Sequence, residues 1–355
     1  NGAPTTSDSY VSQLRSDPFA ANLVLAVPGI LDETNNLITN GSFDSNTSGW
    51  SVIGGASATV NSGQAQLTNN GTTNSSLDQA ITTVVGHNYL VTALITPQGG
   101  GPYPRLYAAG SYGQVASNAN VQQLVSVVRT ATSTSTTISI NANTNVNNAV
   151  TLIDDVKVFD LTPVDYSADI KGSGTNKTLT PYDTAGVGQE LGGYYGSAMN
   201  FEGTGDDDYF DTGYSIDGTF GSGDYTIECW IHTLDDQGER GIFGMFGSQY
   251  GIAMRQFGSY NAGGNQTLQA FFGQSAAGYR CGTTVRIQDQ WNHVAMVKEG
   301  TKGTLYLNGV AVGIADNVSS TPYSTSNLLI GIYYNGQYPY KGYIQDFRVY
   351  TTAKY

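Results

Sequence analysis

The sequence has few charges and few cysteines, and each shortage excludes a class of protein. Lys, Arg, Asp and Glu make up only 12% of the 355 residues, against a usual share of roughly a quarter. Two cysteines are too few for a disulfide scaffold. No apolar run approaches the ~20 residues of a membrane span. The opening residues, NGAPTTSDSY, also lack the basic and apolar regions of a signal peptide.

Basic residues and catalytic motifs are also scarce. The chain has 15 Lys and Arg against 28 Asp and Glu, which gives a net charge of -13. Nucleic acids and anionic membranes require a basic protein face, so neither is expected as a partner. The sequence contains no G-x-S-x-G, P-loop or H-E-x-x-H motif. It also lacks a strand with the alternating carboxylates of laminarinase-type glycosidases. We therefore expect a protein that is not an enzyme.

Glycine, threonine, serine and asparagine are abundant, and they separate short strand-like runs. These runs are β-branched or aromatic and many alternate with period 2, as in YLVTALIT and YTIECWIHT. This pattern is typical of all-β sandwiches and jelly rolls. Asn308-Gly309 between TLYL and VAVG predicts a hairpin with a tight primed turn. Only a short segment near residues 12–15 is compatible with a helix.

Two motifs give residues 36–161 a family resemblance. NLITNGSFDSNTSGW opens the segment and TLIDDVKVFDL closes it, and both resemble the jelly-roll carbohydrate-binding modules found beside polysaccharide-degrading enzymes. The resemblance implies a structural calcium ion held by Asp44 and Asp154, with backbone carbonyls near Asn40. Calcium takes six to eight hard oxygens, which the first and last strands of a jelly roll can supply together. The alternative is that Asp44 only caps a turn and Asp154-Asp155 faces solvent.

The second resemblance covers residues 163–355. Three stretches occur in the order found in concanavalin A-like, laminin-G-type jelly rolls: SAMNFEGTGDDDYFDTG, GSGDYTIECWIHT and WNHVAMVKEGTKGTLYLNGVAVG. A fourth stretch, GYIQDFRVY, is similar to the closing strand of that family. Many such domains belong to virion proteins of marine phages, and these often contain a sequence motif like DYSADIKGSGTNKTLT. In those relatives a stretch like SDPFAANLVLAVP forms the first strand and lies close to that motif. Here the whole segment 36–161 separates the two.

We therefore expect an all-β protein of two jelly-roll β-sandwiches, one inserted into the other. Residues 1–15 form an N-terminal arm. Residues 16–34 and 162–355 form the concanavalin A-like host, and residues 35–161 form the inserted module. Insertion costs little when the termini of the guest lie close together. A simple tandem of two domains with an N-terminal arm is the alternative.

Tyrosines supply the candidate ligand-binding residues. The chain has 24 of them, and each has a flat apolar face and a polar tip that suit a sugar ring or a protein interface. One candidate site is the segment YYNGQYPYKG, with Tyr333, Tyr334, Tyr338 and Tyr340. A second is GGGPYPRLYAAGSYG, with Tyr103, Tyr107 and Tyr112. The alternative is that many of these tyrosines cover the edges of the core.

Two functional hypotheses follow. The first is a structural, adhesive protein at the virion surface, such as a tail fibre, an appendage or a capsid decoration. Its lectin-like domains would bind host surface glycans, and its partners would be other virion proteins, further copies of itself and cell-surface polysaccharide. The second is the non-catalytic carbohydrate-binding region of a secreted polysaccharide-degrading enzyme, which would be extracellular.

Overall fold

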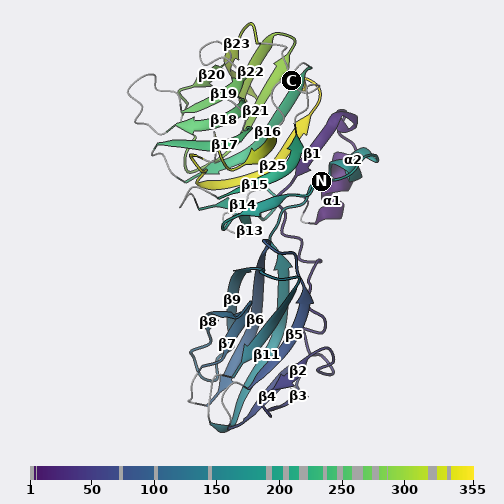
Figure 1. The fold of residues 1–355 in the computed structure, drawn as a ribbon, viewed down its shortest axis with the longest axis vertical. Coiled ribbons are helices and arrows are strands. Elements are labelled where there is room, and N and C mark those ends of the chain that lie inside the picture. The colour runs from purple at the N-terminus through teal and green to yellow at the C-terminus, as the bar shows by residue number, and fades with distance from the viewer. Residues whose placement is uncertain are drawn as a thin grey trace. The chain divides into compact units, whose positions relative to one another are not determined.

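The structure is a computed structural model of residues 1–355. It describes the whole chain except residues 1–3, 5, 72–74, 100–102, 143–145, 189–193, 203–207, 216–222, 235–237, 246–250, 258–266, 274–279, 286, 319–325 and 334–336. The chain divides into two compact units. The larger unit consists of Asn1–Asp32 and Thr162–Tyr355, and the smaller unit is Glu33–Leu161. Both are built from antiparallel sheets, which confirms the expected all-β class (Figure 1).

The smaller unit is a sandwich of two five-stranded sheets around one apolar core. One, the β10 sheet, has the order β2 (Ser51–Ile53), β5 (Ser76–Thr82), β10 (Ser135–Asn141), β7 (Arg105–Ala108) and β8 (Ser111–Val115). The other, the β11 sheet, has the order β3 (Ser57–Asn61), β4 (Gln64–Asn70), β11 (Asn147–Asp160), β6 (Asn88–Gln98) and β9 (Gln123–Thr130). Apolar residues alternate along these strands, so one face of each sheet is buried.

The larger unit also has two sheets. The β25 sheet has eight strands: β13 (Gly186–Gly188), β14 (Ala198–Phe201), β25 (Gly342–Tyr350), β16 (Tyr225–Thr233), β21 (Trp291–Glu299), β22 (Lys302–Leu307), β23 (Val310–Ala315) and β1 (Leu23–Val27), which pairs with β25. The seven-stranded β17 sheet has the order β12 (Thr180–Tyr182), β15 (Tyr209–Ser215), β24 (Asn327–Ile330), β17 (Glu239–Met245), β18 (Ile252–Phe257), β19 (Leu268–Phe272) and β20 (Arg280–Thr283). Edge-to-face ring pairs join the two sheets, as between Phe243 and Phe347 at 5.4 Å.

Strand β25 joins segments that are far apart in the sequence. β1 pairs antiparallel with its C-terminal part, from Leu23 opposite Tyr350 to Val27 opposite Phe347. β14 pairs with its N-terminal part, and β16 pairs along the whole strand. The run from residue 23 to 27 therefore belongs to a sheet whose other strands all follow residue 162.

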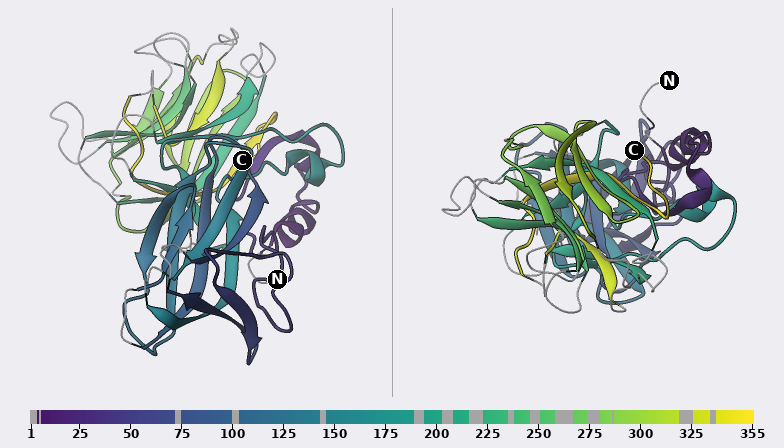
Figure 2. Two further views of the ribbon diagram at one scale, coloured as in Figure 1. Left: turned by 60° about the horizontal axis from the view of Figure 1, so that its bottom comes forward. Right: turned by 90° about the horizontal axis from the view of Figure 1, so that it is seen from above.

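Helices are few and short in the part of the chain that the structure describes. α1 spans Ser7–Leu14, α2 spans Ser167–Lys171, and a single 3-10 turn, η1, spans Ala20–Asn22. The expectation of helix only near residues 12–15 is wrong, because Thr6 and Ser9 form a capping box that starts α1 earlier. The helices lie together beside β1 in every view (Figures 1 and 2). Neither α1 nor α2 has the length that a membrane crossing requires.

The predicted hairpin between β22 and β23 is confirmed. Asn308 and Gly309 have φ angles of 52° and 79°, and Leu307 pairs with Val310 across the two-residue turn. Both φ values are positive, as a primed turn requires. The two cysteines, Cys229 in β16 and Cys281 in β20, are buried and not bridged.

Glycine packing in the larger unit gives a first prediction. A Cβ on Gly331 would lie 2.1 Å from the buried ring of Phe201, whereas one on Gly309 would meet open space, and both residues have positive φ. We expect Gly331→Ala to lower the free energy of unfolding by roughly 2–5 kcal/mol, from backbone strain plus overpacking. Gly309→Ala carries the strain alone, about 1 kcal/mol. Urea unfolding of the two variants checks this, and equal losses would contradict it.

Candidate functional site

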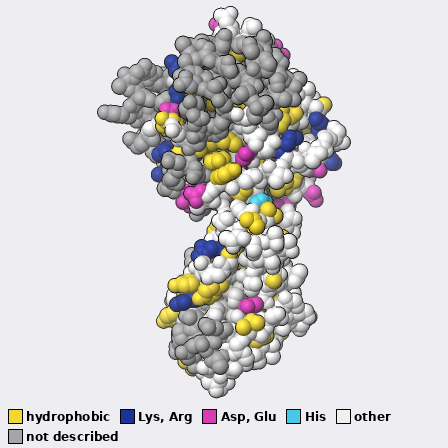
Figure 3. Space-filling view, viewed as in Figure 1, with side chains coloured by type: hydrophobic (Ala, Val, Ile, Leu, Met, Phe, Trp, Pro, Cys, Tyr) yellow, Lys and Arg dark blue, Asp and Glu magenta, His cyan; other side chains and the backbone are white. Residues whose placement is uncertain are grey.

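The β7–β8 hairpin of the smaller unit exposes the tyrosines of the second predicted site. Tyr107 in β7 faces Tyr112 in β8, with ring centroids 5.4 Å apart. The guanidinium of Arg105 lies over the Tyr112 ring at 4.3 Å from its centroid. Tyr103, just before β7, is 44% exposed and Tyr112 is 45% exposed. Apolar and basic side chains gather on this part of the surface in Figure 3. The hairpin therefore presents aromatic surface to solvent.

The register of the β10 sheet extends this aromatic surface into a row. Residues directly opposite each other on neighbouring antiparallel strands lie on the same face. Ser51 pairs with Asp78, Asp78 with Ser139, Ser139 with Tyr107, and Tyr107 with Tyr112. All five are exposed or half-buried, so the row lies on the outer face. We call these five residues the tyrosine row.

Two polar atoms at this face lack a partner in the described part of the chain. The carboxylate oxygen Oδ1 of Asp78 and the Nε of Arg105 are both buried from solvent and neither makes a hydrogen bond. Leaving such a group unpaired costs about 1–3 kcal/mol. Because both atoms are buried, a hydroxyl group of a ligand on the tyrosine row can donate to Asp78 or accept from Arg105 only after that side chain changes rotamer. Local sequence reasoning missed both residues, because Asp78 lies in β5 and only strand register brings it opposite Ser139.

The C-terminal tyrosine segment differs from its prediction. Tyr340 is fully buried, its hydroxyl is 2.8 Å from that of Thr233, and its ring packs on Phe201. The expectation that Tyr340 contacts a ligand is therefore wrong, because the ring fills the core. Tyr338 is 40% exposed, and Tyr334 lies outside the described residues.

Tyr333 likewise packs against other side chains and does not present an exposed ring to a ligand. It is only 7% exposed. The guanidinium of Arg255 lies 4.9 Å from the centroid of the Tyr333 ring and 4.7 Å from that of Phe271, and Arg255 also pairs with Glu239. These contacts hold Tyr333 against the β17 sheet, so its prediction as a ligand-binding residue is wrong as well.

The predicted calcium residues lie where the two ends of the smaller unit meet. The N–H of Val156 donates to the carbonyl of Gly41 at 3.0 Å, which places the segments of Asn40–Asp44 and Asp154–Val156 side by side. Asp44 is exposed, and its Oδ2 accepts from Ser42 at 2.8 Å. Oδ1 of Asp154 accepts from the N–H of the next residue at 2.8 Å.

The donor set in this region suits a hard cation. Asp44 and Asp154 each engage one carboxylate oxygen in these bonds, and the carbonyl of Asn40 accepts from Trp50 Nε1 at 3.1 Å. Carboxylate and carbonyl oxygens are the ligands that calcium prefers. The described residues contain no cluster of three or more His, Cys, Asp or Glu side chains. A calcium ion here would therefore depend on backbone carbonyls for most of its ligands.

Comparison with known proteins identifies part of the larger unit. The Laminin_G_3 family model, described as the concanavalin A-like lectin/glucanases superfamily, matches residues 204–354. Residues 204–354 form a concanavalin A-like domain. No curated protein matches this chain.

Three solved structures match parts of this chain. Domain 4 of a GH43 extracellular arabinanase from Geobacillus stearothermophilus, in complex with arabinotriose, is 20% identical with a TM-score of 0.41, over 55% of this chain and 89% of that chain. A structure entitled "CBM4 structure and function" is 18% identical with a TM-score of 0.29, over 35% of this chain and 99% of that chain. A structure of botulinum neurotoxin type C, whose cell entry depends on two ganglioside molecules, is 14% identical with a TM-score of 0.41, over 55% of this chain and 46% of that chain. All three TM-scores lie below 0.5, so these matches support no statement about the fold or the function of this chain.

The concanavalin A-like domain contains a buried ionic cluster around Glu228. Its carboxylate lies 2.8 Å from Lys354 Nζ and 3.4 Å from Arg348, and His293 Nε2 is 3.7 Å away. Burial by itself would raise the pKa of Glu228, but Arg348 and Lys354 outweigh it and lower that pKa. Burial lowers the pKa of His293. Glu228 is thus an ionised structural partner, not an acid held protonated for catalysis.

Proposed function

We propose that this chain is a non-enzymatic adhesive protein of a virion surface, such as a tail fibre, an appendage or a capsid decoration, and that it binds glycans of the host surface. The observation that carries glycan binding is the tyrosine row, together with the unpaired atoms Asp78 Oδ1 and Arg105 Nε. The virion location rests on the resemblance of DYSADIKGSGTNKTLT to a sequence motif of phage virion proteins.

The chemistry of the tyrosine row suits a sugar chain. The rings of Tyr107 and Tyr112 offer apolar faces on which the C–H groups of a pyranose can stack. Asp78 lies two strands from Tyr107, with Ser139 between them. Neighbouring strands are about 4.8 Å apart, so the row spans more than one sugar ring. With both side chains turned outward, one sugar hydroxyl that donates to Asp78 and another that accepts from Arg105 would fix the orientation of the sugar chain.

Binding to glycans is testable on the intact chain. We expect a broad glycan array to give at least one hit, and calorimetry to show that Tyr112→Ala and Asp78→Asn each weaken that binding about tenfold or more. The loss of a stacking face or of one hydrogen bond to a charged group is of this size. Tyr194→Ala, which removes a comparably exposed tyrosine of the larger unit, is the matched control and should leave the affinity unchanged. Unaltered binding by both row variants, or an array without hits, would refute the proposal.

We further propose a structural calcium ion in the smaller unit, held by Asp44 and Asp154 with backbone carbonyls near Asn40. The adjacency of the two segments supports it. Asp154 is the better candidate of the two neighbouring aspartates, because Asp155 pairs with Lys157 at 2.9 Å. When bound, the ion would tie the first and last segments of the sandwich together.

Chelation tests the calcium proposal. A ligand at one hundred times its Kd stabilises the folded state by about 2.7 kcal/mol, so EDTA should lower the melting temperature of the smaller unit and added calcium should restore it. Asp44→Asn and Asp154→Asn should lose this response, whereas Asp155→Asn should keep it. A melting curve of the wild-type chain that is indifferent to both EDTA and calcium would exclude the site.

The virion location is tested on purified particles. We expect peptides of this chain in fixed stoichiometry to the major capsid or tail protein, and gold-labelled antibodies against it at symmetric positions, because a surface fibre or decoration is present in multiple copies. Absence from the particles would remove the virion role. A catalytic domain in the same polypeptide, released into the medium, would instead support the secreted carbohydrate-binding hypothesis.

A further inference from the structure

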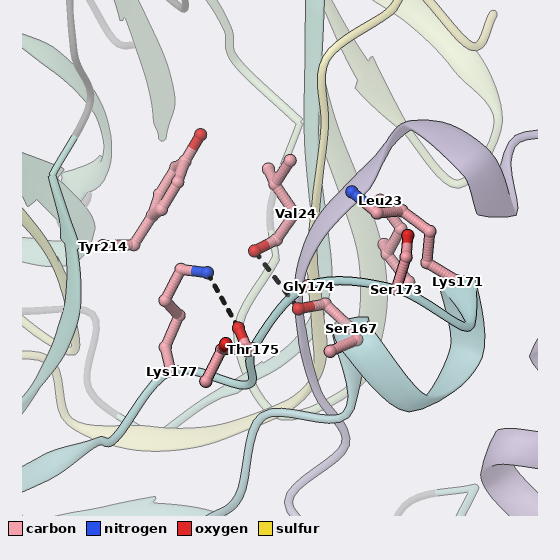
Figure 4. Close-up of a pocket in the computed structure, with 10 residues that line it drawn as sticks. Leu23, Val24, Ser167, Lys171, Ser173, Gly174, Thr175, Lys177 and Tyr214 are labelled. Atoms are coloured by element: carbon pink, nitrogen blue, oxygen red, sulfur yellow. Dashed lines mark hydrogen bonds between the residues drawn. The ribbon is translucent and has the colours of Figure 1, made fainter.

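A small cavity in the larger unit is formed by a segment that the tyrosine row does not involve. It lies where β1, the end of α2 and the following loop meet near Tyr214, and it measures about 80 Å³ (Figure 4). The loop is part of the sequence KGSGTNK, residues 171–177. The cavity is smaller than the ~300–1,000 Å³ of sites for drug-sized ligands. It therefore suits a small group rather than a whole sugar ring.

The charged side chains that line this cavity are all basic. Lys171 and Lys177 lie among the ten lining residues, and no Asp or Glu does. Lys177 Nζ donates to the carbonyl of Thr175 at 3.2 Å and lies 5.6 Å from the centroid of the Tyr214 ring. Neither lysine pairs with a carboxylate in the described part of the chain. In a protein of net charge -13, the side chains that line this cavity carry only positive charge, while the carboxylate of Asp165 contacts the loop from its buried side.

The loop backbone adds further donors. Gly172 and Gly174 have φ angles of 75° and 94°, which glycine adopts at little cost. Within the described residues, no acceptor takes a hydrogen bond from the N–H of Ser173, Gly174 or Thr175. Turns that leave successive N–H groups unpaired form concave anion sites.

A buried carboxylate fixes the loop in place. Asp165, which is fully buried, accepts from the N–H of Ala26 at 2.8 Å, from the N–H and hydroxyl of Ser167 at 2.9 and 2.8 Å, and from the N–H of Lys177 at 2.7 Å. Asn176 accepts from the N–H of Ala168 at 2.8 Å. The donors of the loop are therefore held in position before a ligand arrives, which lowers the entropy cost of binding.

We propose that this cavity binds one oxyanion substituent, a sulfate or carboxylate, of an acidic polysaccharide. Lys171 and Lys177 supply the charge, and the N–H groups of Ser173, Gly174 and Thr175 supply the hydrogen bonds. Two lysines neutralise a single substituent, whereas nucleic acid requires an extended basic surface, which a chain with 15 Lys and Arg against 28 Asp and Glu does not favour. The site is distinct from the tyrosine row and does not depend on it.

The test uses the full chain and two probes. The first is inorganic sulfate, titrated while the amide resonances of residues 172–175 are followed by NMR. The second is a sulfated galactan oligosaccharide, compared by calorimetry with its desulfated parent at 50 and 200 mM salt. We expect shifts confined to the loop, and tighter binding of the sulfated form that weakens as salt rises.

Variants assign the effect to the two lysines. Lys171→Gln with Lys177→Gln should weaken binding of the sulfated oligosaccharide about tenfold or more, since charge-assisted hydrogen bonds are lost. Lys302→Gln, an exposed lysine at the start of β22, is the matched control. Tyr112→Ala should not change the difference between the sulfated and desulfated forms, which separates this site from the tyrosine row.

Three outcomes would overturn the proposal. Equal binding by the double variant and the wild type would exclude the lysines. Sulfate shifts in the loop without any preference for the sulfated oligosaccharide would show a site for free anions and not for a saccharide. Tighter binding of single-stranded DNA than of the sulfated oligosaccharide, lost in the double variant, would assign the site to another polyanion.

Discussion

Backbone pairing of β25 is the constraint on which the larger unit depends. A central strand has N–H and C=O groups on both edges, and each must find a partner because burying it unpaired is costly. β16 satisfies one edge, while the other is shared between β14 and β1. Since residues 33–161 separate β1 from every other strand of this sheet, the sheet is completed only by two distant parts of the chain. The hydrogen bond from Ala26 to Asp165 joins those parts where the chain re-enters the larger unit.

Two buried aspartates extend this constraint to the segments around β25. Asp165 connects β1, the start of α2 and the loop after it. Asp346 in β25 accepts from the hydroxyls of Tyr10 in α1 and of Tyr195, each at 2.8 Å, and pairs with Arg348. Burial, with the charge of Asp346, raises the pKa of both tyrosines, so their hydroxyls remain donors. The positions of both helices thus follow from two buried carboxylates, Asp346 in β25 and Asp165 in the segment just before α2.

The two proposed binding surfaces use different physical devices. The tyrosine row is flat, and strand register aligns Asp78, Ser139 and Tyr107 across three strands. It suits a ligand that offers hydroxyl groups and apolar faces over several ångströms. The cavity beside Lys171 and Lys177 is small and concave, and a turn fixed by Asp165 supplies its donors. It suits one charged group, so the two proposed surfaces would select for different features of a sugar chain.

The sequence by itself determined the features that depend on neighbouring residues. Strand-like runs with alternating apolar residues, separated by glycine, predicted the all-β class. Asn308-Gly309 predicted the hairpin, and motifs in the expected order predicted the concanavalin A-like domain. The start of α1 was also readable in principle from Thr6 and Ser9, although the expectation placed the helix later. Only the tertiary structure decided that Tyr340 fills the core while Tyr112 is exposed, and that Asp78 lies in line with Tyr107. The burial of a side chain and its alignment with residues of other strands depend on pairing between strands far apart in the sequence. A local sequence pattern does not determine the register of that pairing.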